Sequence, residues 1–112
     1  MHELPITESL LDLVLTHAAR AEAERVTDVH VVVGELSGIA SESVAFYWEI
    51  VSRDTAAEGS RLHFRHVPLQ FECRECGSLF ERRGEGFECP SCGAKRVRVA
   101  AGDDCRLEAI DV

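Results

Sequence analysis

The sequence predicts an α/β fold in which a small mixed three-stranded sheet and two helices carry an inserted four-cysteine module. Two segments repeat apolar residues at helical spacing, and three short segments alternate apolar and polar residues as strands do. Four of the five cysteines form two close pairs between the second and third of those strand segments. The chain has 112 residues and is 46% hydrophobic, which is enough for one small core beside a module held by a metal.

The first helix is predicted over residues 5–24. Pro5 suits its first turn, where the missing N–H removes no helical hydrogen bond. His17 falls on the inner face and is expected to be a packed, hydrogen-bonded core residue. Apolar spacing of three and four residues defines that inner face as Ile6, Leu10, Leu13, Val14, His17, Ala18 and Ala21.

The middle of the chain predicts a strand, a loop and a second helix. Residues 27–33 alternate around three valines, and the glycines of residues 34–38 end that strand in a loop. Ser41 is then the expected N-cap of a helix that reaches about Arg53. This helix has more bulky apolar residues than one stripe can hold, so part of its surface is expected to meet a partner.

Two further strands flank the cysteine module. Residues 61–67 alternate and stop at Pro68, and residues 106–112 form a closing strand with Leu107, Ala109 and Ile110 inward. A seven-residue strand is not stable alone, so the closing strand is expected to return to the first sheet. The predicted domains are therefore residues 1–68 with 105–112, and an inserted domain of residues 69–104.

The cysteine pairs read Cys73-Arg74-Glu75-Cys76-Gly and Cys89-Pro90-Ser91-Cys92-Gly. Two intervening residues let the chain turn so that both sulfurs of a pair face one tetrahedral ion. Four thiolates leave no open coordination position, so the pattern predicts a structural Zn(II) site in a zinc ribbon. Disulfides or unrelated thiols are the alternative. Cys105 lies outside both pairs and is expected to be a plain buried or half-buried thiol.

Composition argues against several classes of function. Acidic residues outnumber basic ones 20 to 12 and the net charge is −8, which disfavours nucleic-acid binding. The apolar runs are too short to cross a membrane, and no signal-peptide pattern opens the chain, so a cytoplasmic protein with reduced thiols is expected. No nucleophile–base pair or phosphate-binding loop is evident, so the chain is not expected to be an enzyme.

The first three residues, Met1-His2-Glu3, could bind a metal ion. The terminal amine, the next amide and the His2 imidazole can chelate one ion in fused rings, and planar nitrogen donors suit Ni(II) and Cu(II). An exposed terminus without function is the alternative. His30, His63 and His66 lie on predicted strands, where ordinary surface or core placement competes with metal binding by two of them.

These features, taken in order, resemble the HypA/HybF family of nickel metallochaperones. The resemblance covers the full length: Met1-His2-Glu3, Glu8-Ser9 in the first helix, residues 33–38 (Val-Gly-Glu-Leu-Ser-Gly), and the doubled C-x-x-C. It implies Ni(II) bound by His2 with the backbone nitrogens of Met1, His2 and Glu3, and the Glu3 carboxylate nearby. It implies Zn(II) held by Cys73, Cys76, Cys89 and Cys92.

The resemblance also implies partners. Nickel would be delivered with an accessory GTPase to the hydrogenase large subunit precursor, and in some organisms with urease accessory proteins. Many family members carry histidines in or beside the zinc module, whereas residues 69–104 contain none here. Pro5 stands where family members more often have a helix-capping polar residue. The competing hypotheses are a zinc-ribbon adaptor that docks a protein through Trp48 without binding nickel, and a small metallohydrolase that uses strand histidines.

Overall fold

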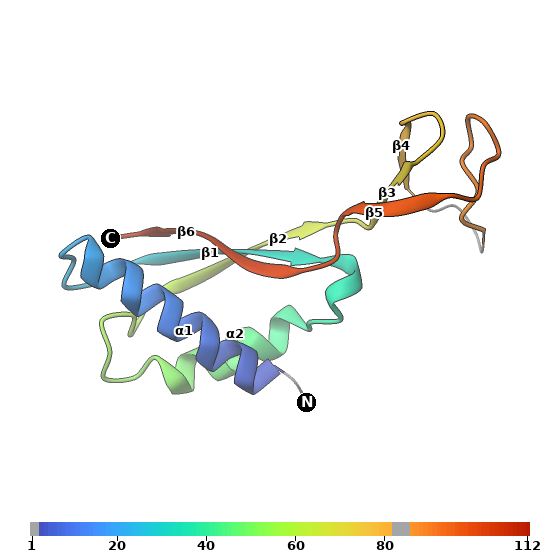
Figure 1. Cartoon of the computed structure of the whole chain (residues 1–112). Coiled ribbons are helices and arrows are strands. Elements are labelled where there is room, and N and C mark those ends of the chain that lie inside the picture. Colours follow the sequence, from blue (N-terminus) through green and yellow to red (C-terminus); the bar gives the residue numbers. More distant parts are fainter. Residues whose placement is uncertain (1–2, 82–85) are drawn as a thin grey trace.

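The computed structural model describes residues 3–81 and 86–112 and has an elongated outline of 54 × 29 × 17 Å (Figure 1). The larger part, here the main part, consists of α1 (Glu3–Arg20), β1 (Asp28–Gly34), the short 3-10 helix η1 (Glu35–Ser37), α2 (Ser41–Val51), β2 (Arg61–Val67) and β6 (Cys105–Asp111). The smaller part, here the ribbon, contains β3 (Gln70–Cys73), β4 (Leu79–Glu81) and β5 (Val97–Ala101).

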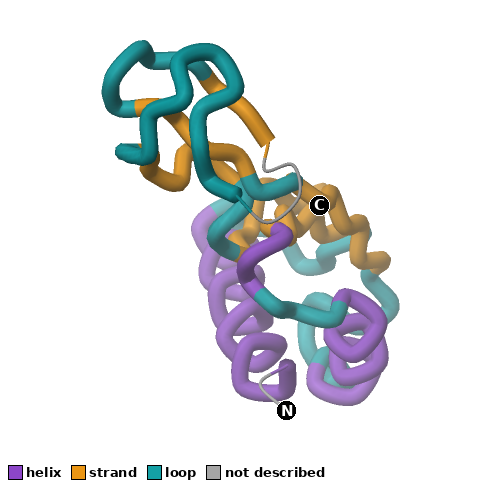
Figure 2. Tube along the Cα trace, turned by 90° about the vertical axis from the view of Figure 1, so that its right-hand side faces the viewer, coloured by secondary structure: helices purple, strands orange, loops and turns teal. Residues whose placement is uncertain are grey.

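The main sheet has the strand order β2-β1-β6, with β1 parallel to β2 and antiparallel to β6. The predicted mixed three-stranded sheet with two helices is therefore confirmed. A parallel neighbour requires a crossover, and α2 supplies it between β1 and β2. Both helices lie on one side of this sheet, so no helix of residues 3–81 and 86–112 covers the opposite face (Figures 1 and 2).

The core lies between the two helices and the main sheet. Val29, Val31 and Val33 of β1 are at most 3% exposed and meet the buried residues of both helices. Trp48 of α2 is 2% exposed, and its Nε1 donates to Ser60 Oγ at 3.0 Å. Trp48 is therefore a core residue, which removes it from any docking surface.

Helix α1 begins and ends earlier than predicted. Its end is a Schellman turn in which Ala23 N donates to Ala18 O at 2.9 Å, with Glu22 at φ 56° where glycine is usual. Pro5 does lie in the first turn. The inner face is also rotated, because Thr7 and Leu11 are buried whereas Leu13 is 50% exposed. Leu13 lines a groove of about 320 Å³ between α1 and β6.

Helix α2 begins at Ser41, and its N-cap is Ala40, which makes no side-chain cap. The prediction that Ser41 is the N-cap was wrong by one residue. The helix ends at Val51 rather than near Arg53. Phe46 and Ile50 are 61% and 46% exposed, so part of this helix faces outward, and its contact with a partner stays a prediction.

Strand β6 contains a bulge that changes which residues point inward. His30 pairs with Ala109 and Val31 with Leu107, which leaves Glu108 as the extra residue. Leu107 and Ile110 pack against the core as predicted. Ala109 is exposed, contrary to prediction, because the bulge interrupts the alternation.

The two parts meet at a tight backbone crossing. Gly34 N donates to Asp104 O at 2.7 Å, and Leu36 N donates to Gly102 O at 2.8 Å. The Glu35 carboxylate accepts the N–H of Leu69 at 2.7 Å. A Cβ on Gly34 would lie 2.5 Å from the carbonyl carbon of Gly102, so the chains approach too closely for a side chain. The segment that begins at Gly34 thus holds both connections to the ribbon.

None of the helices in the described part of the chain is both long enough and apolar enough to span a lipid bilayer.

Candidate metal centre

The two cysteine turns of the ribbon have the same local geometry. Gly77 and Gly93 follow the pairs at φ 78° and 77°, and each glycine N–H donates to the carbonyl of the first cysteine of its pair. The amide two residues after that cysteine approaches its sulfur: Glu75 N lies 3.4 Å from Cys73 Sγ, and Ser91 N lies 3.4 Å from Cys89 Sγ. Amides directed at sulfur stabilise thiolates, as a metal site requires.

The four sulfurs come together in one cluster. All Sγ atoms lie within 4.8 Å of one another, and the Cys73–Cys92 and Cys76–Cys89 separations are both 3.6 Å. A disulfide would bring two sulfurs to ~2.05 Å, so these thiols are unlinked. Four thiolates at the ~2.3 Å Zn–S distance lie about 3.8 Å apart in a tetrahedron. The cluster therefore fits a tetrahedral, thiolate-bound ion.

The environment of Cys76 favours its thiolate. Its Sγ lies 3.2 Å from Ser78 Oγ, and the hydrogen bonds from the Ser78 hydroxyl and main chain lower the pKa of Cys76 to about 6. Cys76 and Cys92 are exposed, whereas Cys73 and Cys89 are buried. Solvent would thus reach a bound ion from the side of the second cysteine of each pair.

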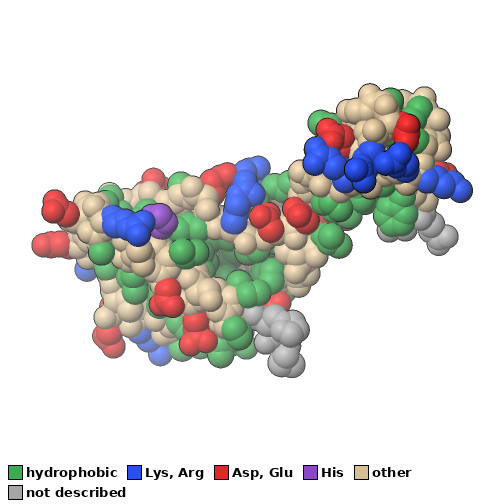
Figure 3. Space-filling view, in the orientation of Figure 1, with side chains coloured by type: hydrophobic (Ala, Val, Ile, Leu, Met, Phe, Trp, Pro, Cys, Tyr) green, Lys and Arg blue, Asp and Glu red, His purple; other side chains and the backbone are tan. Residues whose placement is uncertain are grey.

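Few apolar residues support this cluster. Phe71 is 5% exposed, and its ring centroid lies 5.8 Å from that of Phe80 and 5.5 Å from that of Phe87. Basic side chains gather on the face of the ribbon seen in Figure 3. Arg96 and Arg98 of the ribbon are exposed and pair with Glu75 and Glu72. Such exposed pairs add little stability to the ribbon.

The predicted nickel ligands Met1 and His2 lie outside the described residues. Glu3 is the first described residue and is 9% exposed. Its Oε2 accepts the N–H of Ala40 at 3.2 Å, and its carbonyl accepts the Thr7 hydroxyl. The carboxylate therefore anchors the start of α1 at the start of α2. Sequence reasoning missed this contact, because Glu3 and Ala40 are far apart in the chain.

The remaining histidines fall into different surroundings. His17 is exposed, so the prediction that it is a core residue was wrong. His30 and His63 are opposite each other on β1 and β2, with their rings stacked at 4.9 Å between centroids. His66 lies opposite Val33 instead. The strands thus bring two of the three strand histidines together.

Comparison with known proteins identifies the family. The family model described as "Hydrogenase/urease nickel incorporation, metallochaperone, hypA" matches residues 1–112. The chain belongs to this family. The HypA match therefore includes the N-terminal Met1-His2-Glu3 as well as both cysteine pairs.

Curated relatives align with this chain over nearly their whole length. A hydrogenase maturation factor HypA from Caldanaerobacter subterraneus is 44% identical over 113 residues, covering 100% of this chain and 99% of the relative. One from Geobacter metallireducens is 38% identical, with coverage of 100% and 99%. A hydrogenase maturation factor HybF from Morganella morganii is 35% identical, with coverage of 99% and 98%.

Solved HypA structures share the fold. The solution structure of the Ni metallochaperone HypA from Helicobacter pylori has a TM-score of 0.71 at 24% identity, covering 99% of this chain and 97% of that one. A second solution structure of a HypA protein has a TM-score of 0.79 at 24% identity, with coverage of 99% and 95%. The arrangement of two helices and two three-stranded sheets is thus the HypA fold.

Proposed function

We propose that this protein binds Ni(II) at its N-terminus and delivers it during maturation of nickel–iron hydrogenase, and of urease where that enzyme is present. The family match over residues 1–112 carries this proposal, because it includes Met1-His2-Glu3 together with the cysteine pairs. The proposed role is delivery of a metal ion and not catalysis.

The proposed nickel ligands are the His2 imidazole and the backbone nitrogens of Met1, His2 and Glu3. Nitrogen donors in a plane suit Ni(II), whereas Zn(II) prefers a tetrahedral set. The anchoring of Glu3 at Ala40 N supports the proposal, since it fixes the backbone at the edge of the ligand set. A site at a chain end also releases its ion without moving many packed atoms.

We assign Zn(II) to Cys73, Cys76, Cys89 and Cys92. Zinc there would supply a structural crosslink, because four thiolates leave no position for water or substrate. Since no histidine lies between residues 69 and 104, the nickel site of this chain is not completed by a histidine of the zinc module.

The two metals divide the chain into two proposed domains. Residues 1–68 with 105–112 would carry nickel, and residues 69–104 would carry zinc. The proposed partners are an accessory GTPase, the hydrogenase large subunit precursor and, where urease is made, its accessory proteins. These are cytoplasmic roles, which agrees with five free cysteines, because the cytosol keeps thiols reduced.

A nickel titration at pH 7.5 and pH 5.5 tests the proposed site on three zinc-loaded proteins. These are untagged protein, protein extended before Met1, and His2→Ala. Untagged protein should bind one equivalent with the diamagnetic signature of planar Ni(II), and binding should weaken below about pH 6.5 as imidazole is protonated. His2→Ala should lose this planar site while keeping zinc, and the extension should weaken binding or alter its geometry.

The same titration separates the proposal from a zinc-ribbon adaptor that binds no nickel. Phe46 and Ile50 are the observation in favour of an adaptor, since both are exposed apolar residues on α2. Equal planar nickel binding by untagged protein and His2→Ala would contradict the N-terminal site. The absence of nickel binding from untagged protein would favour the adaptor.

A further inference from the structure

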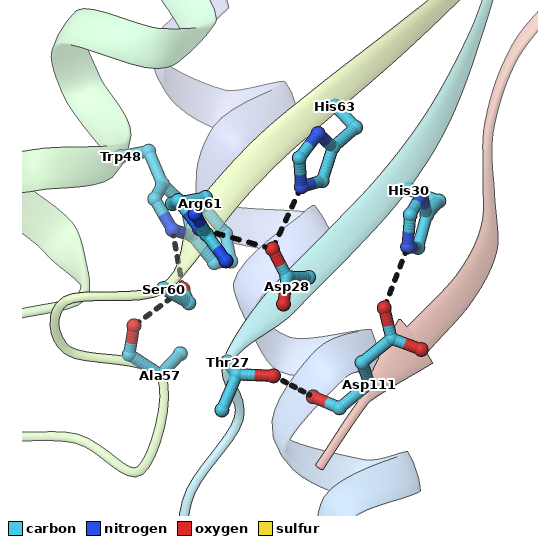
Figure 4. A network of polar contacts seen from close by, with 9 residues as sticks. All are labelled: Thr27, Asp28, His30, Trp48, Ala57, Ser60, Arg61, His63 and Asp111. Atoms are coloured by element: carbon cyan, nitrogen blue, oxygen red, sulfur yellow. Dashed lines mark hydrogen bonds and ion pairs between the residues drawn. The ribbon is translucent and has the colours of Figure 1, made fainter.

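The helix-free face of the main sheet carries two imidazoles side by side (Figure 4). His30 on β1 and His63 on β2 are register partners, and their rings stack with 4.9 Å between centroids and 18° between planes. Their side chains are 36% and 47% exposed, so solvent ions can reach both. Imidazole is a ligand for Ni(II), Cu(II) and Zn(II).

Each imidazole meets a carboxylate. His30 Nε2 lies 2.8 Å from Asp111 Oδ2, and His63 Nε2 lies 2.7 Å from Asp28 Oδ1. Asp28 and Asp111 are themselves register partners on β1 and β6. Two nitrogen and two oxygen donors from three strands thus face the same side of the sheet.

We propose that Asp28, His30, His63 and Asp111 form a second, weak site for a divalent transition-metal ion, distinct from the cysteine cluster and the chain terminus. Two imidazoles and two carboxylates make a nitrogen–oxygen donor set of the kind that binds Ni(II) and Zn(II). Adjacent ligands around an octahedral ion with ~2.1 Å bonds lie about 3 Å apart. The two N···O distances, 2.8 and 2.7 Å, are those of hydrogen bonds, so each pair must give up its shared hydrogen before both of its atoms can bind one ion.

The two pairs must converge for one ion to be bound. Two ligand atoms bound to one ion through ~2.1 Å bonds lie at most about 4.2 Å apart. Stacked imidazole rings point their nitrogen lone pairs in parallel directions and not at one common point. The imidazoles therefore tilt towards each other on binding. This movement needs no change in the backbone, because the register of β1 and β2 holds His30 opposite His63. The contacts that must rearrange are the two histidine–aspartate hydrogen bonds, in which both imidazoles are at least 36% exposed.

One neighbouring cation competes with the ion. Arg61 Nε lies 3.1 Å from the same Asp28 oxygen that His63 contacts, and the Arg61 side chain is 76% exposed. Arg65 lies further along β2 and pairs with Glu108. Replacing Arg61 should therefore free Asp28 and strengthen metal binding several-fold. The proposed site exchanges its ion readily, since three of its ligands (His30, His63 and Asp111) are at least 36% exposed, while the fourth, Asp28, is 15% exposed.

The test uses nickel chloride and full-length, zinc-loaded His2→Ala protein, so that the proposed N-terminal site is removed first. Calorimetry should detect one weak equivalent of Ni(II). Nitrogen–oxygen coordination leaves Ni(II) paramagnetic, so amide signals around His30 and His63 should broaden selectively. Adding His30→Gln or His63→Gln should weaken binding at least ~10-fold, as loss of a metal-site contact does. Adding Arg61→Gln should strengthen it.

His2→Ala with His66→Gln is the matched control, because His66 is an exposed histidine of β2 outside this cluster. It should bind nickel like His2→Ala alone. Amide spectra of each variant show that it is folded. The proposal is overturned if His2→Ala binds no nickel up to millimolar concentration, or if the His30 and His63 substitutions leave binding unchanged. Planar nickel lost in His2→Ala concerns the N-terminal site, so the two proposals fail separately.

Discussion

The main part and the ribbon differ in how many apolar side chains they bury. In the main part, apolar residues of α1, β1 and α2 are buried in one core, and partly buried apolar residues of β2 and β6 pack against it. In the described ribbon, the buried side chains are Phe71, Cys73 and Cys89, two of which are candidate metal ligands. A unit this small rarely folds on apolar burial alone. With the proposed Zn(II) bound, stability in this chain would be divided between hydrophobic packing and a metal site.

The largest effect should come from the ribbon cysteines. Cys73→Ser or Cys89→Ser removes a buried thiolate, and structural zinc contributes about 10–16 kcal/mol of apparent binding energy to folding. The variants should lose zinc and the dispersed amide signals of residues 69–104, while the signals of the main part persist. Zinc analysis and amide spectra measure both effects.

Cys105→Ala is the control for the cysteine variants, because Cys105 is half-buried in β6 and outside the cluster. It should keep its zinc. Unfolding of the whole chain by Cys73→Ser would show that the main part needs the ribbon, contrary to the division described above.

The next largest loss of stability should come from substitutions at the backbone crossing between the main part and the ribbon. Gly102 has φ 84°, and a Cβ there would lie 2.4 Å from the carbonyl oxygen of Pro68. Gly102→Ala should destabilise the protein by roughly 3 kcal/mol or more, combining left-handed strain with overpacking. Gly38→Ala should cost only about 1 kcal/mol, since φ is 70° but no atom lies within 4 Å. Urea denaturation compares the two, and equal losses would contradict the close approach.

Within the main part, two leucines of α1 should differ sharply. Leu10 is 6% exposed, and Leu10→Ala should destabilise the protein by about 2–5 kcal/mol through lost packing. Leu13 is 50% exposed, so Leu13→Ala should stay within about 1 kcal/mol of the parent. Thermal unfolding of both variants measures the difference. A larger effect at Leu13 would mean that α1 packs with the face originally predicted.

The smallest effect should come from the polar face of the main sheet. A hydrogen bond and the charge of Arg65 lower the pKa of Glu108, with Nη2 and Oε2 2.5 Å apart. The pair stabilises the fold above the ordinary glutamate pKa, and this contribution is lost as pH falls through the lowered value. Glu108→Gln should therefore reduce stability slightly at pH 7 and not at pH 2. Glu49→Gln on α2 is the control, and denaturation at both pH values is the measurement.

Local sequence patterns predicted where the strands lie better than which side of each helix or strand is buried. Strand β2 has its predicted bounds, because clear alternation ends at Pro68. The inner face of α1 was misplaced, since apolar residues at 10, 11, 13, 14 and 15 cover a broad sector. Which side of that sector is buried depends on where α2 and β1 lie. The bulge at Glu108 likewise arises from pairing with β1, which no local pattern shows.

The candidate site was predictable where spacing alone determines it. The doubled C-x-x-C specified all four clustered cysteines, because each pair closes over only two residues. The anchoring of Glu3 at Ala40 and the contacts of His30 and His63 with aspartates depend on tertiary structure. Histidines that belong to different strands give no signal in the sequence until the strand register is known.

The crossing at Gly34 and Gly102 has an evolutionary consequence. The chain leaves the main sheet after β2 and returns before β6 at neighbouring positions, and β3 and β5 pair directly beyond that point. The ribbon is thus a loop closed at its base, so residues can be added or removed at its far end without altering the register of the main sheet. Related chains could therefore vary the length of the ribbon tip freely, whereas the two glycines at its base would be retained.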